Sequence, residues 1–235
     1  MMAKQRGQAI AEYVYVVPIM LLLIFGAIQF AFIYQAKSTL NYATFVATRQ
    51  GALKNGAMST IQEALAGGLA PLFTHDRDLA ALKAAYTYAD KELRDAKLTD
   101  IRIVNPTSAA LGAFQSQSDS GSEIPNDNLM YRDATDVSGG MNVQDANLLK
   151  VRVTYCYRMV VPIINKLIFN LTVNPSGTAP ATPKTAPEIL ASTGAGGSAG
   201  LCTDIPAEEY RIPISAEAVV RMQTPFQDPG AWSAP

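Results

Sequence analysis

The sequence predicts an α+β protein, in which a long N-terminal transmembrane helix is followed by a small head domain with an antiparallel sheet packed against helices. Three observations support this fold class. Residues 13–36 form an apolar stretch without a single charge. Residues 76–97 carry apolar side chains at helical spacing. Residues 148–161 and 210–224 show the alternation of apolar and polar side chains that is typical of strands.

The chain divides into four predicted segments over its 235 residues. Residues 1–7 form a leader, 8–36 the transmembrane helix, 37–68 a helical extension, and 69–235 an exported α+β head with a flexible Pro/Thr/Ala- and Gly/Ser-rich loop at 174–200. The net charge is −1, and no basic stretch with interleaved aromatic residues occurs. We therefore expect no nucleic-acid partner.

The apolar stretch is long enough to span a bilayer. A helix over residues 13–36 is about 36 Å long, which exceeds a hydrocarbon core of about 30 Å. Lys4 and Arg6 precede it, and Gly7 is followed at the fifth place by a single carboxylate, Glu12. Three interpretations fit this arrangement: a cleaved secretory signal, a plain uncleaved anchor, and a leader that a dedicated peptidase removes.

Each interpretation makes different demands on the sequence. A secretory signal requires small residues at the first and third positions before the cut, and the frames that end at Gly26, Ala27 or Ala31 fail this test. A plain anchor explains the length but gives Gly7 and Glu12 no role. A cut after Gly7 would create an α-amino group on Gln8, about 6 Å of helix rise from Glu12.

A carboxylate at the edge of a membrane helix is costly and usually functional. In a bundle of such helices, the new amine of one subunit could pair with Glu12 of a neighbour and fix the axial register of the two helices. Lys4 and Arg6 favour a cytoplasmic N-terminus, although Lys37, Arg49 and Lys54 on the other side weaken this bias. The short N-terminus and the downstream cysteines favour export of the head.

Cys156 and Cys202 are expected to pair if the head is exported. In the chain-entropy model, closing a loop of about 47 residues stabilises the fold by roughly 4 kcal/mol. The alternative is two unpaired buried thiols. One histidine and two separated cysteines do not supply a zinc ligand set, and the acidic residues between 119 and 136 lack the spacing of a calcium loop. We expect no metal and no cofactor.

The remaining elements follow from periodicity and turn residues. The helical pattern continues past residue 36, with a break expected between Gly51 and the Gly67–Gly68 pair. We expect a helix over 76–97, capped by Thr74 or Asp76. One apolar face of this helix is expected to cover a sheet. That face consists of Leu79, Leu82, Tyr86, Ala89 and Leu93.

The second half of the chain supplies the strands. We expect a short strand near 101–104, polar loops over 107–147, and a strong strand at 148–161. Residues 163–173 form either a short helix near the bilayer or a further strand. The last strand, 210–224, carries Pro213 at a bulge or edge position, and the tail after it is expected to fray.

No catalytic residue is predicted. The sequence has no G-x-S-x-G, H-E-x-x-H or paired-cysteine redox motif. The adjacent pair Glu208 and Glu209 would diverge in a strand. An enzyme is therefore not expected.

The segment QRGQAIAEY resembles the processing motif of Flp-type (type IVb) pilins, with Glu12 and Tyr13 after the glycine. Together with a long helix and a terminal strand of the form SAEAVVRM, it resembles the TadE-like family of tight-adherence pilus pseudopilins. Major Flp pilins end soon after the apolar helix, whereas this chain continues with a head at 69–235. The resemblance is therefore to a pseudopilin with a pilin-like fold.

This resemblance implies cleavage between Gly7 and Gln8 by a prepilin peptidase, and a role for Glu12 and Tyr13 in subunit assembly. The implied partners are other pseudopilins, the major Flp pilin, the inner-membrane assembly platform and the lipid bilayer. The implied location is the bacterial inner membrane, with a single span, a cytoplasmic N-terminus and a periplasmic head, or an extracellular pilus. The alternative is a membrane-tethered periplasmic binding protein with an uncleaved anchor.

Overall fold

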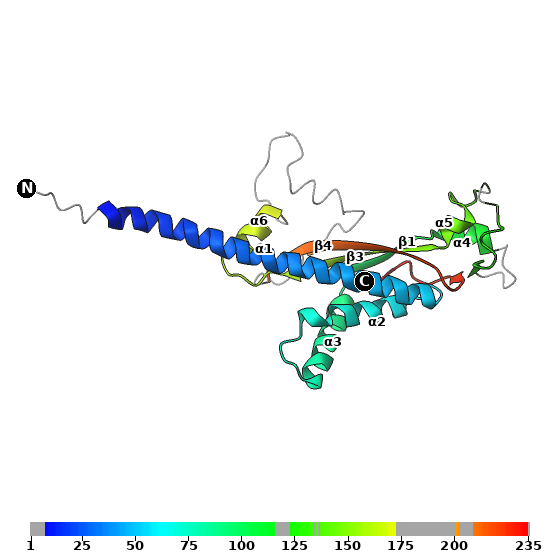
Figure 1. Cartoon of the computed structure of the whole chain (residues 1–235), viewed down its shortest axis with the longest axis horizontal. Coiled ribbons are helices and arrows are strands. Elements are labelled where there is room, and N and C mark those ends of the chain that lie inside the picture. The colour runs from blue at the N-terminus through cyan, green and yellow to red at the C-terminus, as the bar shows by residue number, and fades with distance from the viewer. Residues whose placement is uncertain are drawn as a thin grey trace, which may run out of the picture.

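The structure, a computed structural model, describes residues 8–115, 123–133, 135, 137–172, 201–202 and 209–234. Its longest element is helix α1 (Gln8–Leu53), which continues through Pro18. The N-terminal half of α1 extends away from the rest of the protein, and its C-terminal half lies along the head (Figure 1). The predicted leader, residues 1–7, and the predicted flexible loop, residues 174–200, fall outside the described residues.

The head combines short helices with two antiparallel sheets, which confirms the predicted α+β fold. The main sheet has the strand order β4-β3-β1-β6, and β2 pairs with β5. The helical elements after α1 are α2 (Met58–Leu69), the 3-10 helix η1 (Ala70–Leu72), α3 (Leu79–Leu93), α4 (Ser108–Phe114), α5 (Val143–Ala146) and α6 (Ile164–Thr172). The strands are β1 (Thr99–Asn105), β2 (Glu123–Ile124), β3 (Leu148–Arg158), β4 (Arg211–Arg221), β5 (Phe226–Gln227) and β6 (Ser233–Ala234).

The core forms where the C-terminal half of α1 packs on β3 and β4. The helix presents small or apolar side chains at helical spacing, and Leu40, Ala43 and Ala47 are fully buried. The sheet presents one face of β3, on which Val151 and Val153 are buried, as their alternation predicted. Burial of these apolar surfaces is what holds α1 to the sheet.

The predicted break after α1 is confirmed at residues 54–57. Asn55 and Gly56 both adopt positive φ there, and a Cβ on Gly56 would lie 2.3 Å from the ring of Phe226. Only glycine fits that position. α2 then turns back along α1, and Gly68 allows the close approach, since a Cβ on it would lie 2.7 Å from the Cα of Ala43.

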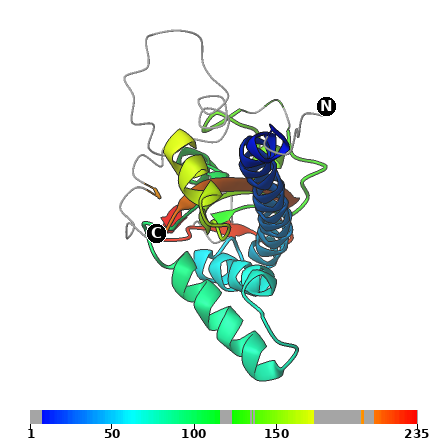
Figure 2. The same ribbon diagram turned by 90° about the vertical axis from the view of Figure 1, so that its left-hand side faces the viewer.

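The prediction for α3 is partly wrong. Its N-cap is Asp78, whose carboxylate accepts a hydrogen bond from the Leu79 N–H at 2.7 Å, and neither Thr74 nor Asp76 has this role. The helix stands away from the body and packs mainly on α2 and η1 (Figure 2). Consequently Leu79 and Leu82 are exposed, and the buried residues of α3 begin at Ala85.

Three further expectations are resolved. Residues 164–172 form helix α6, so the helical alternative for this segment is correct. Pro213 lies in an edge strand, opposite Cys156 in a regular register, without a bulge. The expectation of a frayed tail is wrong, because β5 and β6 pair with β2 and β1 and Phe226 is fully buried.

Candidate functional site: the apolar helix and its attachment to the head

The N-terminal half of α1 is an unusually exposed apolar surface. Among the described residues, one helix is long enough and apolar enough to cross a membrane. This helix is α1, judged by its length and composition over Glu12–Leu53. Its exposed large apolar side chains include Tyr13, Val14, Ile19, Leu23, Phe30 and Phe32. A continuous apolar surface of this extent requires a cover of lipid or protein. It fits a single-pass membrane anchor.

The predicted assembly residues lie at the start of this helix. Gln8 is its first residue, and Glu12 and Tyr13 follow about one turn later. Both Glu12 and Tyr13 are exposed. Gly7, the other half of the predicted cleavage site, falls outside the described residues. The structure therefore places Gln8, Glu12 and Tyr13 on one helical segment that projects beyond the head.

The first charge after the apolar stretch connects α1 to the sheet. The Lys37 ammonium donates a hydrogen bond to the backbone carbonyl of Ser215 in β4. Burial lowers the pKa of Lys37, while the nearby Glu217 carboxylate acts in the opposite direction. The end of the apolar stretch is thereby fixed to the edge strand.

A second polar contact lies within the apolar stretch itself. Gln29 has an exposed fraction of 0%. Its side-chain Oε1 accepts a hydrogen bond from the backbone N–H of Val161 at 2.8 Å. Val161 belongs to the turn that leads from β3 into α6, so this bond attaches α6 to the apolar half of α1.

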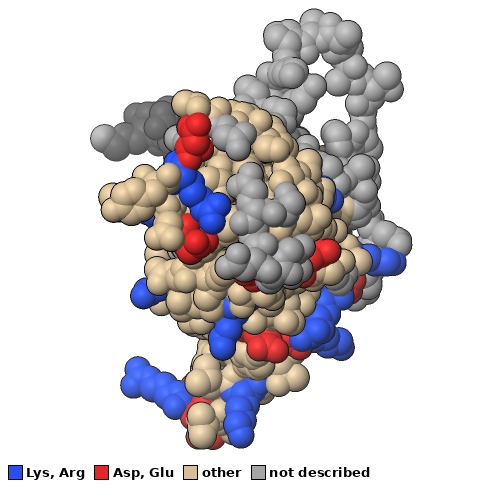
Figure 3. All heavy atoms as spheres, turned by 90° about the vertical axis from the view of Figure 1, so that its right-hand side faces the viewer, with Lys and Arg blue, Asp and Glu red and all other residues tan. Residues whose placement is uncertain are grey.

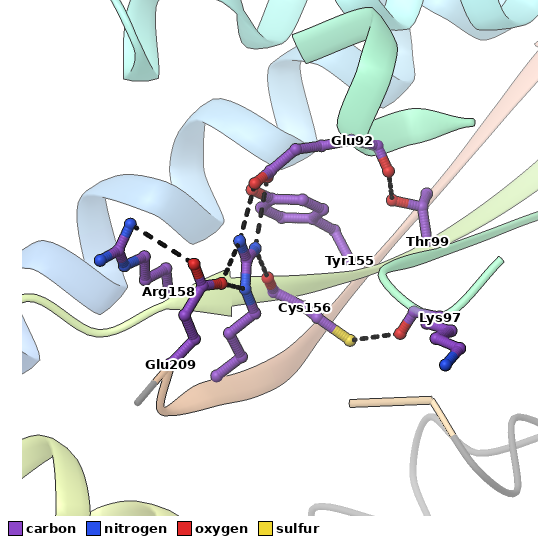
Figure 4. Close-up of polar contacts among 8 residues, drawn as sticks. Glu92, Lys97, Thr99, Tyr155, Cys156, Arg158 and Glu209 are labelled. Carbon is purple, nitrogen blue, oxygen red and sulfur yellow. Dashed lines mark hydrogen bonds and ion pairs between the residues drawn. The ribbon is translucent and has the colours of Figure 1, made fainter. Parts of the chain in front are cut away.

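A buried polar cluster joins α3 to the two long strands (Figure 4). Arg211 of β4 donates to the Glu92 carboxylate of α3 at 2.8 Å and to the Cys156 carbonyl of β3 at 3.0 Å. Glu209 approaches the same guanidinium at 2.9 Å. The Tyr155 hydroxyl also donates to Glu92. The guanidinium therefore has two carboxylates and a carbonyl as partners.

The environment of this cluster shifts two pKa values. Burial raises the pKa of the Tyr155 phenol well above its usual value, and the neighbouring Glu92 charge raises it further. Burial alone would lower the pKa of Arg211, but the hydrogen bond and the charge of Glu92 outweigh it. The pKa of Arg211 therefore lies above its usual value, and the cluster holds a buried ion pair between Arg211 and Glu92.

The disulfide lies beside this cluster. Cys156 and Cys202 are bonded, with a Cα–Cα distance of 5.7 Å, as predicted. The Cys202 N–H donates to the Lys97 carbonyl at 3.2 Å. The bridge therefore attaches the chain before β4 to the middle of the sheet and to the α3–β1 connection.

An open cleft of about 630 Å³ adjoins the cluster, between η1, α3 and the end of β3. Its lining includes the rings of Phe73, Tyr88 and Tyr157, and Glu92 and Tyr155 lie at its wall. Glu92 already accepts hydrogen bonds from Arg211 and from Tyr155. Over the described ranges, no three His, Cys, Asp or Glu side chains form a group that could hold a metal ion.

The face farthest from the N-terminal end of α1 carries charges of both signs. Lysine and arginine side chains are mixed there with aspartate and glutamate, and uncharged areas separate them (Figure 3). A polyanion binds to a surface on which positive charges predominate. The visible described surface of this face does not have that pattern.

Sequence reasoning missed Gln29, Glu92 and Arg211. Gln29 could have been noticed as an amide inside an apolar stretch. Glu92 falls on the same helix face as Ala85 and Ala89, which are buried. The spacing of these small residues could therefore have indicated that Glu92 is buried too. Nothing in the sequence pairs Arg211 with Glu92, because 119 residues separate them.

The comparison with known protein families finds a match to the N-terminal helix. Residues 7–49 match the family model described as TadE-like protein. No curated protein matches the chain, and no solved structure does. The matched range begins at Gly7 and includes Glu12, Tyr13, Gln29 and Lys37. Over residues 7–49 the resemblance to the TadE-like family is thus confirmed, and the chain is consistent with a TadE-like protein of the Tad pilus system.

Proposed function

We propose that the chain is a minor pseudopilin of a Flp, or tight-adherence, type IVb pilus. It acts in pilus assembly, adhesion or secretion. The observation that carries this proposal is the TadE-like match, which starts at Gly7 and follows the exposed apolar half of α1. The head beyond α1 has its own sheet and shares a core with the C-terminal half of α1, which supports a minor component over a bulk filament subunit.

In this proposal a prepilin peptidase cuts between Gly7 and Gln8 on the cytoplasmic side of the inner membrane. The new amine of Gln8 then begins α1, one turn before Glu12. In an assembled bundle that amine pairs with Glu12 of a neighbouring subunit, with Tyr13 beside it. The neighbours are other pseudopilins and the major Flp pilin, delivered through the inner-membrane assembly platform. The head lies in the periplasm.

The mature N-terminus tests the processing step. The full chain is extracted from membranes of its host, with and without the prepilin peptidase, and its N-terminal peptide is identified by mass spectrometry. We expect Gln8 as the first residue when the peptidase is present and an intact leader when it is absent. A mature N-terminus at Met1, at Met2 or beyond residue 25 would overturn the proposal.

A substitution of Glu12 tests the pairing. Glu12→Ala removes the carboxylate but leaves the apolar stretch, so insertion and cleavage are expected to persist while the number of surface pili falls. Glu63→Ala, at an exposed acid on α2, is the matched control and should leave pili unchanged. Normal pilus numbers with Glu12→Ala would contradict the pairing.

The alternative function is a membrane-tethered periplasmic binding protein with an uncleaved anchor. The open cleft of about 630 Å³ beside α3 favours it. Deleting the gene distinguishes the two functions, because a pseudopilin is required for surface pili and an independent binding protein is not.

A further inference from the structure

Helix α6 is held against both the head and the apolar half of α1. The Gln29–Val161 hydrogen bond fixes its start, and Ile164 is buried. Further along, the ring of Phe169 packs edge-on against Tyr210, with ring centroids 5.6 Å apart. α6 lies beside α1 and runs across the long axis of the molecule (Figures 1 and 2).

The outward side of α6 is a row of exposed apolar side chains. Leu167 and Leu171 are four residues apart and lie on one face of α6, and Ile163 is the residue directly before the helix. Ile163 has an exposed fraction of 72%, and Leu167 and Leu171 are also exposed. Ile163 adopts φ 70°, which is strained for a β-branched residue. A strained turn that displays an apolar side chain to water calls for a partner.

The position of α6 along α1 identifies that partner. Glu12 and Gln29 are separated by about 26 Å of helix rise. A hydrocarbon core is about 30 Å thick. If Glu12 lies at one membrane surface, Gln29 and the attached α6 therefore lie at the opposite surface. The inference rests on the proposed membrane span of α1, and it is independent of leader cleavage and of pilus assembly.

We propose that α6 lies on the outer surface of the bilayer, next to the point where α1 emerges. Ile163, Leu167 and Leu171 enter the boundary between headgroups and acyl chains, as in-plane amphipathic helices do. Lys166 and Asn170 border the row and stay among the headgroups. The partner is the lipid surface itself.

The charge of the segment defines the kind of lipid surface. Lys166 is the single charged residue between Met159 and Thr172. Insertion is therefore driven by apolar area, with little attraction to anionic headgroups. Neutral and anionic bilayers should hold α6 equally well. With α1 across the membrane and α6 on its surface, the head has two points of attachment, which restrict its tilt.

A tryptophan placed on the row tests this geometry in the full chain. Leu167→Trp is made in a Trp232→Phe background, which removes the chain's one native tryptophan. The protein is reconstituted into vesicles of phosphatidylcholine, with or without phosphatidylglycerol, and quenched by brominated lipid or by aqueous acrylamide. Leu171→Trp provides a second position on the row. Leu23→Trp marks the span, and Tyr131→Trp, at a side chain with an exposed fraction of 88%, marks the free head surface.

We expect brominated lipid to quench Leu167→Trp and Leu171→Trp strongly in both lipid mixtures, and acrylamide to quench Tyr131→Trp. If Leu23→Trp is quenched by lipid while both α6 positions respond only to acrylamide, the placement of α6 is overturned. Protection of both α6 positions from both quenchers indicates a protein cover, such as a second copy, and also overturns it. Loss of lipid quenching at Leu23→Trp overturns the span and, with it, the placement of α6.

Discussion

Arg211 and Glu92 form an ion pair at 2.8 Å, and their side chains have exposed fractions of only 3% and 7%. The pair joins β4 to α3 across β3. Charges buried to this degree are costly when one partner is removed, because the other remains without compensation. The pair therefore adds a polar link between α3 and the sheet to the packing of α3 on α2 and η1.

The first prediction concerns this pair. Glu92→Gln should lower the free energy of unfolding by about 3 kcal/mol, since it leaves the Arg211 charge buried with only part of its compensation. Asp90→Asn is the matched control on the same helix, because its ion pair with Arg94 is at the surface. That control should cost less than about 1 kcal/mol. Urea unfolding of the full chain in detergent, followed by circular dichroism, measures both; equal losses would contradict a special role for Glu92.

The second prediction concerns alkaline pH. The pKa of Tyr155 is raised in the folded state, so its contribution to stability is fully present below the unfolded pKa of about 10. As the pH rises above about 10, the unfolded phenol ionises first, and that stability is lost. Tyr155→Phe should therefore show a smaller loss of stability between pH 8 and pH 11 than the parent chain.

Tyr131→Phe, at an exposed phenol, serves as the control for this titration. This variant should lose as much stability between pH 8 and pH 11 as the parent chain does. The measurement is the urea midpoint of each chain at the two pH values. Identical alkaline losses in the parent, Tyr155→Phe and Tyr131→Phe would show that Tyr155 does not contribute.

The third prediction compares two adjacent glycines in α2. A Cβ on Gly68 would lie 2.7 Å from the Cα and Cβ of Ala43, whereas a Cβ on Gly67 meets nothing within 4 Å. Gly68→Ala should destabilise the fold by about 1–3 kcal/mol through overpacking. Gly67→Ala should stabilise it by about 0.5–1 kcal/mol through helix propensity. Thermal unfolding of both variants checks the opposite signs, and a shared sign would refute the close α1–α2 contact.

The fourth prediction concerns the Cys156–Cys202 bridge. Its sequence separation of 46 places the expected stabilisation at about 4 kcal/mol in the chain-entropy model. Dithiothreitol should therefore lower the unfolding midpoint of the parent chain markedly. The double variant Cys156→Ala and Cys202→Ala should unfold near the reduced parent and should not respond to the reductant. If the oxidised parent chain is no more stable than the double variant, the bridge does not stabilise the fold.

The strands and the apolar helix could be predicted because their signals are local. The alternation around Val151 and Val153 is contained within one strand, and the core face of α1 repeats at helical spacing. The disulfide was predictable because two cysteines allow one pairing. These features need no knowledge of distant segments.

The remaining features depend on contacts that no local pattern encodes. The tail is ordered because Phe226 fills the space above Gly56, and α3 is half exposed because only its last turns reach the sheet. Among the predicted assembly residues, Glu12 and Tyr13 lie near the start of α1, and their role in subunit assembly stays a prediction. The Gln29–Val161 bond spans 132 residues.

The contact between Lys37 and Ser215 joins positions 178 residues apart. A ribosome makes α1 first and then α2, which packs on Ala43, whereas β4, to which Lys37 is bonded, is made near the end. Until β4 is made, the side of α1 that contacts this strand lacks its native cover, and it can associate with other apolar surfaces. The nascent chain therefore completes its interior only when its C-terminal region is released, and a stalled or shortened product lacks the strand that closes it.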